Sequence, residues 1–209
     1  FTETVLGRNP AVIVCVDAWP DDAILATNAR EHNAPTTAFL REAGGAFENR
    51  YFLPIGELPL VGHASLAAAH VVLKILRPGL VSATLKRRNG ALRISAEDGG
   101  RLAITLSASP AQPCTTPAGL AGALGAEIAE IRANGAQYFV VLENASTVAR
   151  IAPDMDALMR LDRDGLVVTA RGEDCDFVSR AFAPKEGLPE DPVCGSAHLA
   201  LVPFWAERL

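Results

Sequence analysis

Three ionisable side chains lie beside a glycine that opens an apolar segment: His63 in one stretch, and Asp191 and Cys194 in another. A thiol at the start of a helix can have its pKa lowered into the range of about 3.5–7.5, so Cys194 is a candidate acid or base. Asp191 lies three residues earlier and is a second candidate, although its charge would oppose ionisation of the thiol. His63 could donate to an anion or shuttle a proton.

Each of these residues also has a structural interpretation that the sequence leaves open. Cys194 can be a small buried residue that fills a tight loop. Asp191 precedes a proline, where aspartate is commonly a turn or capping residue. A lone histidine in an apolar helix, such as His63, is commonly a hydrogen-bonded core residue, and His70 and His198 fit that interpretation better still.

The two glycines, Gly62 and Gly195, predict helix starts at which a ligand can approach the backbone closely. The first N–H groups of a helix have no partner inside it, and together with the helix dipole they form an anion site. Ser196 would be either a capping hydroxyl or a ligand contact. If both helix starts face one cleft, they would hold a carboxylate and stabilise the charge that appears when the adjacent carbon loses its proton. This layout favours proton transfer beside a carboxylate, with an acid and a base on opposite sides of the carbon and without metal or coenzyme.

The two glycine stretches belong to an internal repeat. One offset of 133 residues recurs at distant points of the chain, and a second offset of 130 is reconciled with it by three extra residues around 185–191. The aligned segments are 61–67 with 194–200, 20–25 with 153–158, and, at the smaller offset, 50–54 with 180–184. Because the matches keep the same order along the chain, we interpret them as a duplicated half.

Each half is expected to contain a strand, a helix that follows Pro-Asp, two further strands and a buried apolar helix that begins at glycine. In the first half these elements are expected at 11–16, 21–32, 37–40, 50–53 and 62–76. In the second half they are expected at 138–142, 154–161, 166–169, 177–182 and 195–205. Asn89-Gly90 predicts a hairpin within a three-stranded meander over 84–106, whose copy would lie beyond residue 209.

Prolines at 110, 113 and 117 mark a linker over 107–116, and a helix is expected over 120–132. We therefore predict an N-terminal lobe, residues 1–108, and a C-terminal lobe, residues 109–209, whose last strands are missing from the sequence. The alternative is one continuous α+β domain with a proline-rich loop.

Composition excludes several classes of protein. The chain has 209 residues, of which 49% are hydrophobic and 21% charged, which predicts a packed core rather than disorder. An excess of 24 acidic over 19 basic residues argues against nucleic acid or an anionic membrane as the main partner. Four cysteines form no CxxC pair and no metal-type cluster with the four histidines, so we expect reduced thiols in a cytoplasmic protein that holds no metal.

The two ends of the sequence also carry expectations. The longest apolar stretch, 64–76, is well short of the roughly 20 residues that a membrane span needs, and no signal peptide is visible. Because the sequence begins at Phe1 rather than Met, we expect its natural start to lie upstream.

The segment Glu57-Leu-Pro-Leu-Val-Gly-His-Ala-Ser-Leu-Ala-Ala-Ala-His70 resembles the first-lobe signature of the phenazine-biosynthesis PhzF-like isomerases. The segment Glu190-Asp-Pro-Val-Cys-Gly-Ser-Ala-His198 resembles their second-lobe signature, and 9–11 and 33–39 match further stretches. The resemblance implies a diaminopimelate-epimerase-like α+β fold of two pseudo-symmetric lobes. Each lobe would be a curved, mostly antiparallel or mixed sheet around a central helix, with the active site between the lobes.

The same resemblance implies a cofactor-independent isomerase or epimerase that moves a proton on a small carboxylate substrate, in a protein that forms a homodimer. It places residues that contact substrate or relay a proton at Gly62, His63, Asp191, Gly195 and Ser196. These are the residues that the glycine motifs already singled out.

The sequence departs from the family pattern at Thr36. The family's catalytic glutamate belongs in an Asn-x-Ser-Glu-Thr-x-Phe stretch, which here reads Asn-Ala-Pro-Thr-Thr-Ala-Phe over 33–39. Thr36 takes the place of the glutamate, and its hydroxyl, not ionised near neutral pH, can contact a substrate but cannot be that base. The cysteine-pair racemases of this fold need thiols at both helix starts, whereas this chain has Val61 and Cys194. The family's Ser-x-Arg-Gly-Gly stretch would lie beyond residue 209.

Two hypotheses follow, and we favour the first. The protein is an isomerase in which Cys194 or Asp191 is the remaining acid or base. Alternatively, it is a non-catalytic small-molecule-binding or interaction protein that has lost the chemistry along with the glutamate. A hydrolase that uses Cys194 with His198, four residues later, is a weaker third hypothesis.

Overall fold

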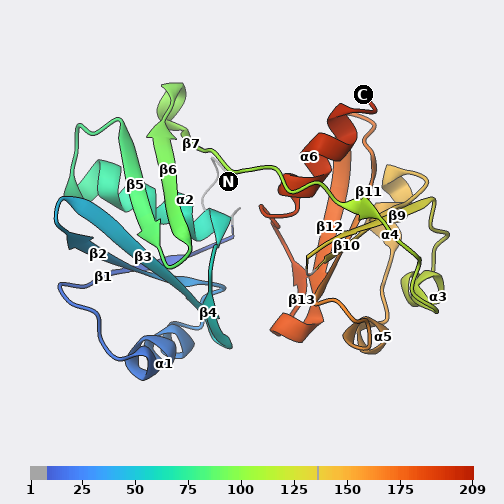
Figure 1. Ribbon diagram of the computed structural model, residues 1–209, viewed down its shortest axis with the longest axis horizontal. Coiled ribbons are helices and arrows are strands. Elements are labelled where there is room, and N and C mark those ends of the chain that lie inside the picture. The colour runs from blue at the N-terminus through green and yellow to red at the C-terminus, as the bar shows by residue number, and fades with distance from the viewer. Residues whose placement is uncertain (1–8, 136) are drawn as a thin grey trace. The chain divides into compact units, whose positions relative to one another are not determined.

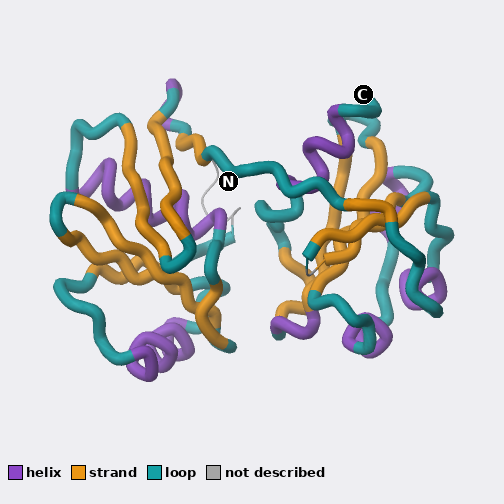
Figure 2. Tube along the Cα trace, in the orientation of Figure 1, coloured by secondary structure: helices purple, strands orange, loops and turns teal. Residues whose placement is uncertain are grey.

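The computed structural model describes residues 9–135 and 137–209, which belong to two compact units. Unit 1 comprises Phe1–Leu106 and unit 2 comprises Ser107–Leu209, so the boundary predicted after residue 108 falls just inside unit 2. Figure 1 colours unit 1 from blue to green and unit 2 from yellow-green to red, and Figure 2 shows helices and strands in both.

Seven strands form one mixed sheet in the described part of unit 1. They are β1 (Val12–Cys15), β2 (Thr37–Ala43), β3 (Ala46–Leu53), β4 (Gly56–Leu58), β5 (Ser82–Arg87), β6 (Gly90–Ala96) and β7 (Leu102–Ile104). The order is β1-β2-β3-β5-β6-β7, with β4 paired to the end of β3. β1 and β2 are parallel, because helix α1 (Asp22–His32) makes the crossover between them.

Alternate residues of the unit 1 sheet enter two different cores. Phe39 and Phe52 pack with Leu25 of α1. Leu40 and Phe47, on the other face, pack against helix α2 (Gly62–Val71) and the π-helical turn Val72–Leu76 that continues it. The helix expected from residue 62 to residue 76 is therefore found. One face of it is buried against the sheet, but His70, Lys74 and Ile75 are exposed, so the burial expected from its nearly all-round apolar sequence is found in part.

Six strands form the sheet of unit 2 within its described residues. They are β8 (Gln112–Pro113), β9 (Glu130–Asn134), β10 (Gln137–Val141), β11 (Gly165–Arg171), β12 (Phe177–Ala183) and β13 (Leu188–Asp191). Their order is β13-β12-β11-β10-β9-β8. β10 and β11 are parallel, and two short helices, α4 (Ala145–Arg150) and α5 (Met155–Met159), lie in the crossover.

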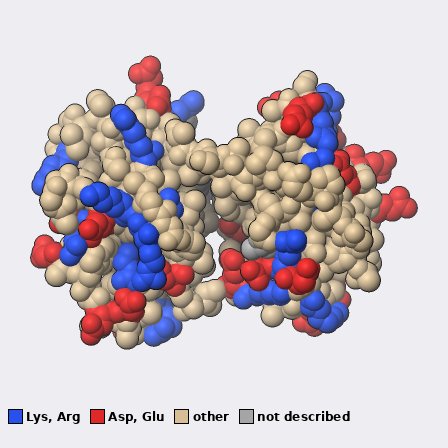
Figure 3. All heavy atoms as spheres, in the orientation of Figure 1, with Lys and Arg blue, Asp and Glu red and all other residues tan. Residues whose placement is uncertain are grey.

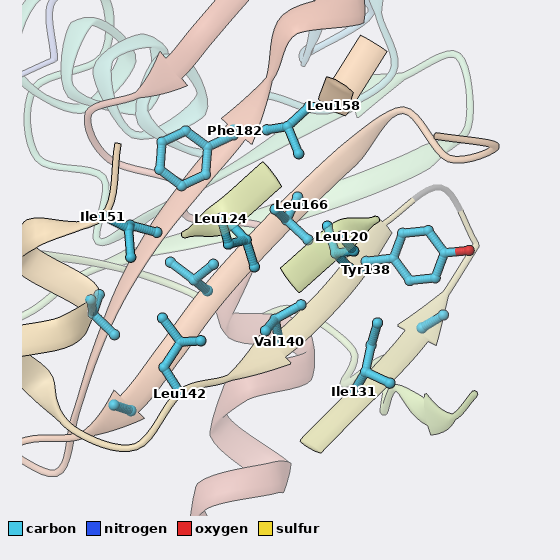
Figure 4. Packing of buried hydrophobic residues seen from close by; sticks show 14 residues of the cluster. Leu120, Leu124, Ile131, Tyr138, Val140, Leu142, Ile151, Leu158, Leu166 and Phe182 are labelled. Carbon is cyan, nitrogen blue, oxygen red and sulfur yellow. The ribbon is translucent and has the colours of Figure 1, made fainter. Parts of the chain in front are cut away.

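The unit 2 sheet also separates two cores. Figure 4 shows Leu166 and Phe182 of the sheet beside Leu124 of α3 (Leu120–Leu124) and Leu158 of α5. On the other face, Val167 and its neighbours pack against helix α6 (His198–Ala206). None of the helices in the described ranges is both long and apolar enough to cross a membrane.

The same pairing pattern occurs in both units. A parallel pair, β1–β2 or β10–β11, is followed by an antiparallel strand, β3 or β12, and then by a short antiparallel strand, β4 or β13. The buried helix, α2 or α6, comes after that short strand. This order agrees with the duplication inferred from the sequence offsets.

Two expected helices were placed wrongly. The helix expected over 120–132 ends at Leu124, because Gly125 adopts a left-handed conformation (φ 64°), and the strand β9 occupies Glu130–Asn134. Within β9, Ile131 and Ala133 are buried, an alternation with the period of a strand.

The helix expected from Gly195 begins at His198. Residues 195–200 form successive i→i+3 turns, and the first i→i+4 hydrogen bond runs from the Leu201 N–H to the Ala197 carbonyl (3.0 Å). Glycine and serine are weak helix formers, and these tighter turns already satisfy the first carbonyls. Pro203 inside α6 has no N–H to give the Leu199 carbonyl, which accepts the Ser109 N–H instead (2.8 Å).

Candidate active site

The first motif enters α2 through Val61, an extended N-cap residue (φ −133°, ψ 109°) with no capping side chain. No acidic residue lies in the first turn, which begins with Gly62. The Val61 carbonyl is tied down by Ser65, which donates from its backbone N–H (2.9 Å) and its hydroxyl (2.8 Å). The helix start is thus fixed in place, and its N-cap residue contributes no capping side chain, which suits a helix start that binds an anion.

Two other residues predicted for the site belong to unit 1, one in α2 and one beside β2. His63 is the second residue of α2 and is partly exposed. Thr36 directly precedes β2, is only 2% exposed, and accepts the Val12 N–H at its backbone carbonyl (3.0 Å). His70, expected in the core, is exposed near the end of α2, so that expectation is wrong.

The second motif follows β13. Asp191 ends this strand, and its Oδ1 accepts the Val193 N–H (3.1 Å), which is the turn geometry expected of aspartate before proline. The Cys194 sulfur lies 3.4 Å from the Ser196 hydroxyl, and Ser196 is exposed. His198, expected in the core, is exposed, with Nδ1 3.2 Å from the Cys194 carbonyl.

The expectation that helix geometry lowers the pKa of Cys194 is wrong. Burial raises the pKa of this thiol above its ordinary value, and the nearby Asp191 carboxylate raises it further; the hydrogen bond with Ser196 only partly opposes them. Gly195 is a turn residue rather than the start of α6, so little helix dipole acts on the sulfur. Cys194 is therefore a neutral thiol near neutral pH, able to give up a proton but not to take one.

A hollow of about 280 Å³ in unit 2 brings Ser196 together with two acidic residues, Asp164 and Glu186. The glycine motifs did not point to these two carboxylates. In the structure, Asp164 directly precedes β11 as Thr36 directly precedes β2, an equivalence that the sequence offsets do not align. A larger hollow of about 660 Å³ lies beside α4 and contains none of the predicted site residues.

Glu186 is a further candidate base. It ends a 3₁₀ turn, Pro184–Glu186, just before β13. Burial raises its pKa, and the negative charges of Asp164 and Asp191 raise it further. A carboxylate with a raised pKa is a stronger base than an ordinary one, which suits proton abstraction.

The raised pKa of Glu186 predicts a pH-dependent effect on stability. Its ionised form is disfavoured in the folded state, so the wild type loses stability as pH rises from the unfolded pKa through the folded one. We expect Glu186→Gln to raise the melting temperature at pH 7 and to leave it unchanged below about pH 4. The gain should stay under about 1 kcal/mol, because the side chain is partly exposed. Thermal melts at both pH values measure it, with exposed Glu173→Gln as control; an equal gain at both pH values would contradict it.

No group of three or more His, Cys, Asp or Glu side chains in the described ranges is arranged to hold a metal ion. On the face drawn in Figure 3, acidic and basic side chains are interspersed in both units.

Residues 1–209, the whole chain, match the family model described as phenazine biosynthesis-like protein, PhzC-PhzF. The chain belongs to this family. An uncharacterized isomerase from Pseudomonas aeruginosa is 41% identical over 209 residues, which cover all of this chain and 80% of the relative. An uncharacterized isomerase from Halalkalibacterium halodurans is 32% identical over 216 residues, with the same coverage.

Solved structures of the PhzC-PhzF family share the fold. A phenazine biosynthesis protein of the PhzF family from Enterococcus faecalis superposes with a TM-score of 0.92 and 35% identity, covering all of this chain and 80% of that one. A probable proline racemase from Agrobacterium radiobacter has a TM-score of 0.54 at 14% identity, covering 83% of this chain and 60% of that one, and shares the fold alone. These likenesses confirm the predicted α+β fold of epimerase type.

Membership of the PhzC-PhzF family confirms the resemblance that the two glycine motifs carried. It makes the departure at Thr36 more important, because the position expected to hold the base carries a buried hydroxyl. The candidate carboxylates, Asp191 from the sequence and Glu186 and Asp164 from the structure, all belong to unit 2.

Proposed function

We propose that this PhzC-PhzF protein is a cofactor-independent isomerase that moves a proton on a small carboxylate substrate. The observation that carries the proposal is the unit 2 segment in which the Asp191 carboxylate, the neutral thiol of Cys194 and the Ser196 hydroxyl lie close together, in a chain whose curated relatives are named as isomerases. A carboxylate and a thiol so placed can take a proton from a substrate carbon and return one. In unit 1, the start of α2 at Gly62 follows an N-cap residue without a capping side chain, and backbone N–H groups at helix starts bind carboxylates.

The roles of the side chains follow from their protonation. Asp191 or Glu186 takes the proton from the substrate carbon, and Cys194, a neutral thiol, returns a proton at the new position. Ser196, whose hydroxyl lies 3.4 Å from the thiol sulfur, donates to that sulfur or to the substrate. In unit 1, His63 beside Gly62 is the candidate contact for an anion, and Thr36, whose hydroxyl is not a base, has no part in proton transfer.

Proton exchange with heavy water tests the proposal. The protein is incubated in D₂O with a panel of 2-hydroxy, 2-amino and unsaturated ring carboxylates, and the proton on the carbon next to the carboxylate is followed by NMR. We expect at least one compound to lose this signal with the native protein and to keep it with heat-unfolded protein. Binding without exchange would instead favour the non-catalytic binding protein, to which Thr36 in place of glutamate already points.

The two glycines give a separate test. Neither Gly62 nor Gly195 has a positive φ, and a Cβ at either would meet no atom within 4 Å. Alanine at these positions should therefore leave the melting temperature unchanged or raise it slightly. If a ligand approaches this backbone, the added methyl groups should weaken carboxylate binding, measured by titration calorimetry, by about tenfold or more. Gly122 in α3 has equally open surroundings, so Gly122→Ala is the matched control; binding unchanged in both site variants would contradict the prediction.

A further inference from the structure

Two bidentate ion pairs occupy equivalent places in the two units. In unit 1, Arg50 donates from Nε to Glu57 Oε1 (2.8 Å) and from Nη2 to Oε2 (2.6 Å). In unit 2, Arg180 donates from Nε to Glu190 Oε1 (2.7 Å) and from Nη2 to Oε2 (2.8 Å). The same nitrogens meet the same oxygens, in the fork geometry that distinguishes strong arginine–carboxylate pairs from loose ones.

The surroundings of the two guanidinium groups are also repeated. Each lies 5.1 Å from a ring centroid, Arg50 over Phe52 and Arg180 over Phe182. In each case Nη1 reaches the crossover between the parallel strands: Arg50 binds Asp22 Oδ1 at the start of α1 (2.8 Å), and Arg180 binds carbonyls at the end of α4. The pairing raises the pKa of both arginines. Each guanidinium group is thus held by the ring and by the Nη1 hydrogen bond in addition to the fork.

The carboxylate of each pair lies on the short strand that leads into a glycine motif. Glu57 is in β4 and Gly62 follows five residues later; Glu190 is in β13 and Gly195 follows at the same spacing. These strands have few backbone contacts of their own. β4 is three residues long, and the pairing of β13 with β12 shifts register between Ala181 and Ala183. The side-chain fork therefore adds to the short backbone pairing that ties each motif to its sheet.

We propose that the Arg50–Glu57 and Arg180–Glu190 pairs are positioning residues of the active site, each holding its glycine motif in register with the sheet. The catalytic part of this statement rests on the proposed function; the anchoring part does not. Each arginine fixes a glutamate, the glutamate fixes the short strand, and the strand sets where the backbone N–H groups and the Asp191–Ser196 segment lie.

Hydrogen exchange measured by mass spectrometry tests the anchoring directly. Glu57→Gln and Glu190→Gln keep the side-chain shape but replace one acceptor oxygen with an amide NH₂ group. This group is a donor, so it cannot accept a hydrogen bond from the guanidinium group. We expect exchange to rise about fivefold in peptides covering 58–65 for the first variant and 191–199 for the second. Glu48→Gln is the control, because Glu48 pairs with Arg41 across β2 and β3 through its Oε2 (Nε 3.0 Å, Nη2 2.7 Å) but leads to no motif. Exchange unchanged at the motifs, or raised equally by Glu48→Gln, would overturn the proposal.

Kinetics then separate positioning from general loss of stability. With whichever carboxylate the native protein deuterates, the two motif variants should lose about tenfold in turnover while the KM changes less than twofold, and Glu48→Gln should behave as the native protein. An equal loss in all three variants would show that the pairs act only through stability. If the native protein deuterates no carboxylate, the proposed function fails, and the hydrogen-exchange result still decides whether the pairs hold the motifs.

Discussion

Asp191→Asn and Cys194→Ala are each expected to slow substrate deuteration by about 10²–10⁴-fold, the range typical of losing a general acid or base. Asparagine keeps an oxygen for the Val193 N–H, which Asp191 accepts at 3.1 Å, so the turn survives while the charge is lost. The same change should lower the pKa of Cys194, because the carboxylate is one of the groups that raise it. NMR deuteration rates and the pH dependence of Cys194 alkylation measure the two effects.

A second aspartate in unit 2 provides the control for this experiment. Asp154 caps α5 by accepting the Ala157 N–H at 3.0 Å, a geometry close to that of Asp191, but it lies outside the motifs. Asp154→Asn should leave deuteration unchanged. Equal losses in both variants would assign Asp191 a structural role, and a loss confined to Glu186→Gln would make Glu186 the base.

The sequence predicted the fold well where one residue type decides the local structure. Glycine at 62 marks the start of α2, and Asp21 at the N-cap and Asp154 with its capping oxygen mark the starts of α1 and α5. The alignment of Arg50 with Arg180 at an offset of 130, together with the other segments aligned at an offset of 133, also predicted that the two units are equivalent. These signals are local or repeated, so they survive without knowledge of tertiary contacts.

The errors occurred where tertiary contacts determine the local structure or the pKa of a side chain. An apolar run after Leu120 predicted one long helix, but burial of alternate residues, such as Ile131, made its second part a strand. The pKa of Cys194 depends on how far the sulfur is buried and on the distance to Asp191, and the local sequence determines neither of them. Glu186 was missed for the same reason, because it becomes a candidate only when folding brings it to the hollow with Ser196.

Trp205→Ala is expected to lower the free energy of unfolding of unit 2 by about 3–5 kcal/mol, the usual cost of removing a large buried aromatic side chain. The Trp205 ring is 7% exposed, lies parallel to Phe177 at 6.1 Å and meets Phe204 edge-on at 5.2 Å. Its Nε1 also donates to Thr169 Oγ1 (3.0 Å), which ties α6 to the centre of the sheet.

Urea unfolding followed by circular dichroism measures this loss, and hydrogen exchange in β11 locates it. Val202 lies on the same helix but is 51% exposed, so Val202→Ala should cost little and controls for changes in helix propensity. Trp205→Phe keeps most of the packing and removes the donor to Thr169; because that hydroxyl still donates to the Val178 carbonyl (2.7 Å), its cost should be well below that of alanine. A Trp205→Ala loss no larger than that of Val202→Ala would mean that α6 is not held by this side chain. The second motif leads directly into α6, so in that case the Arg180–Glu190 pair alone would hold the motif in position.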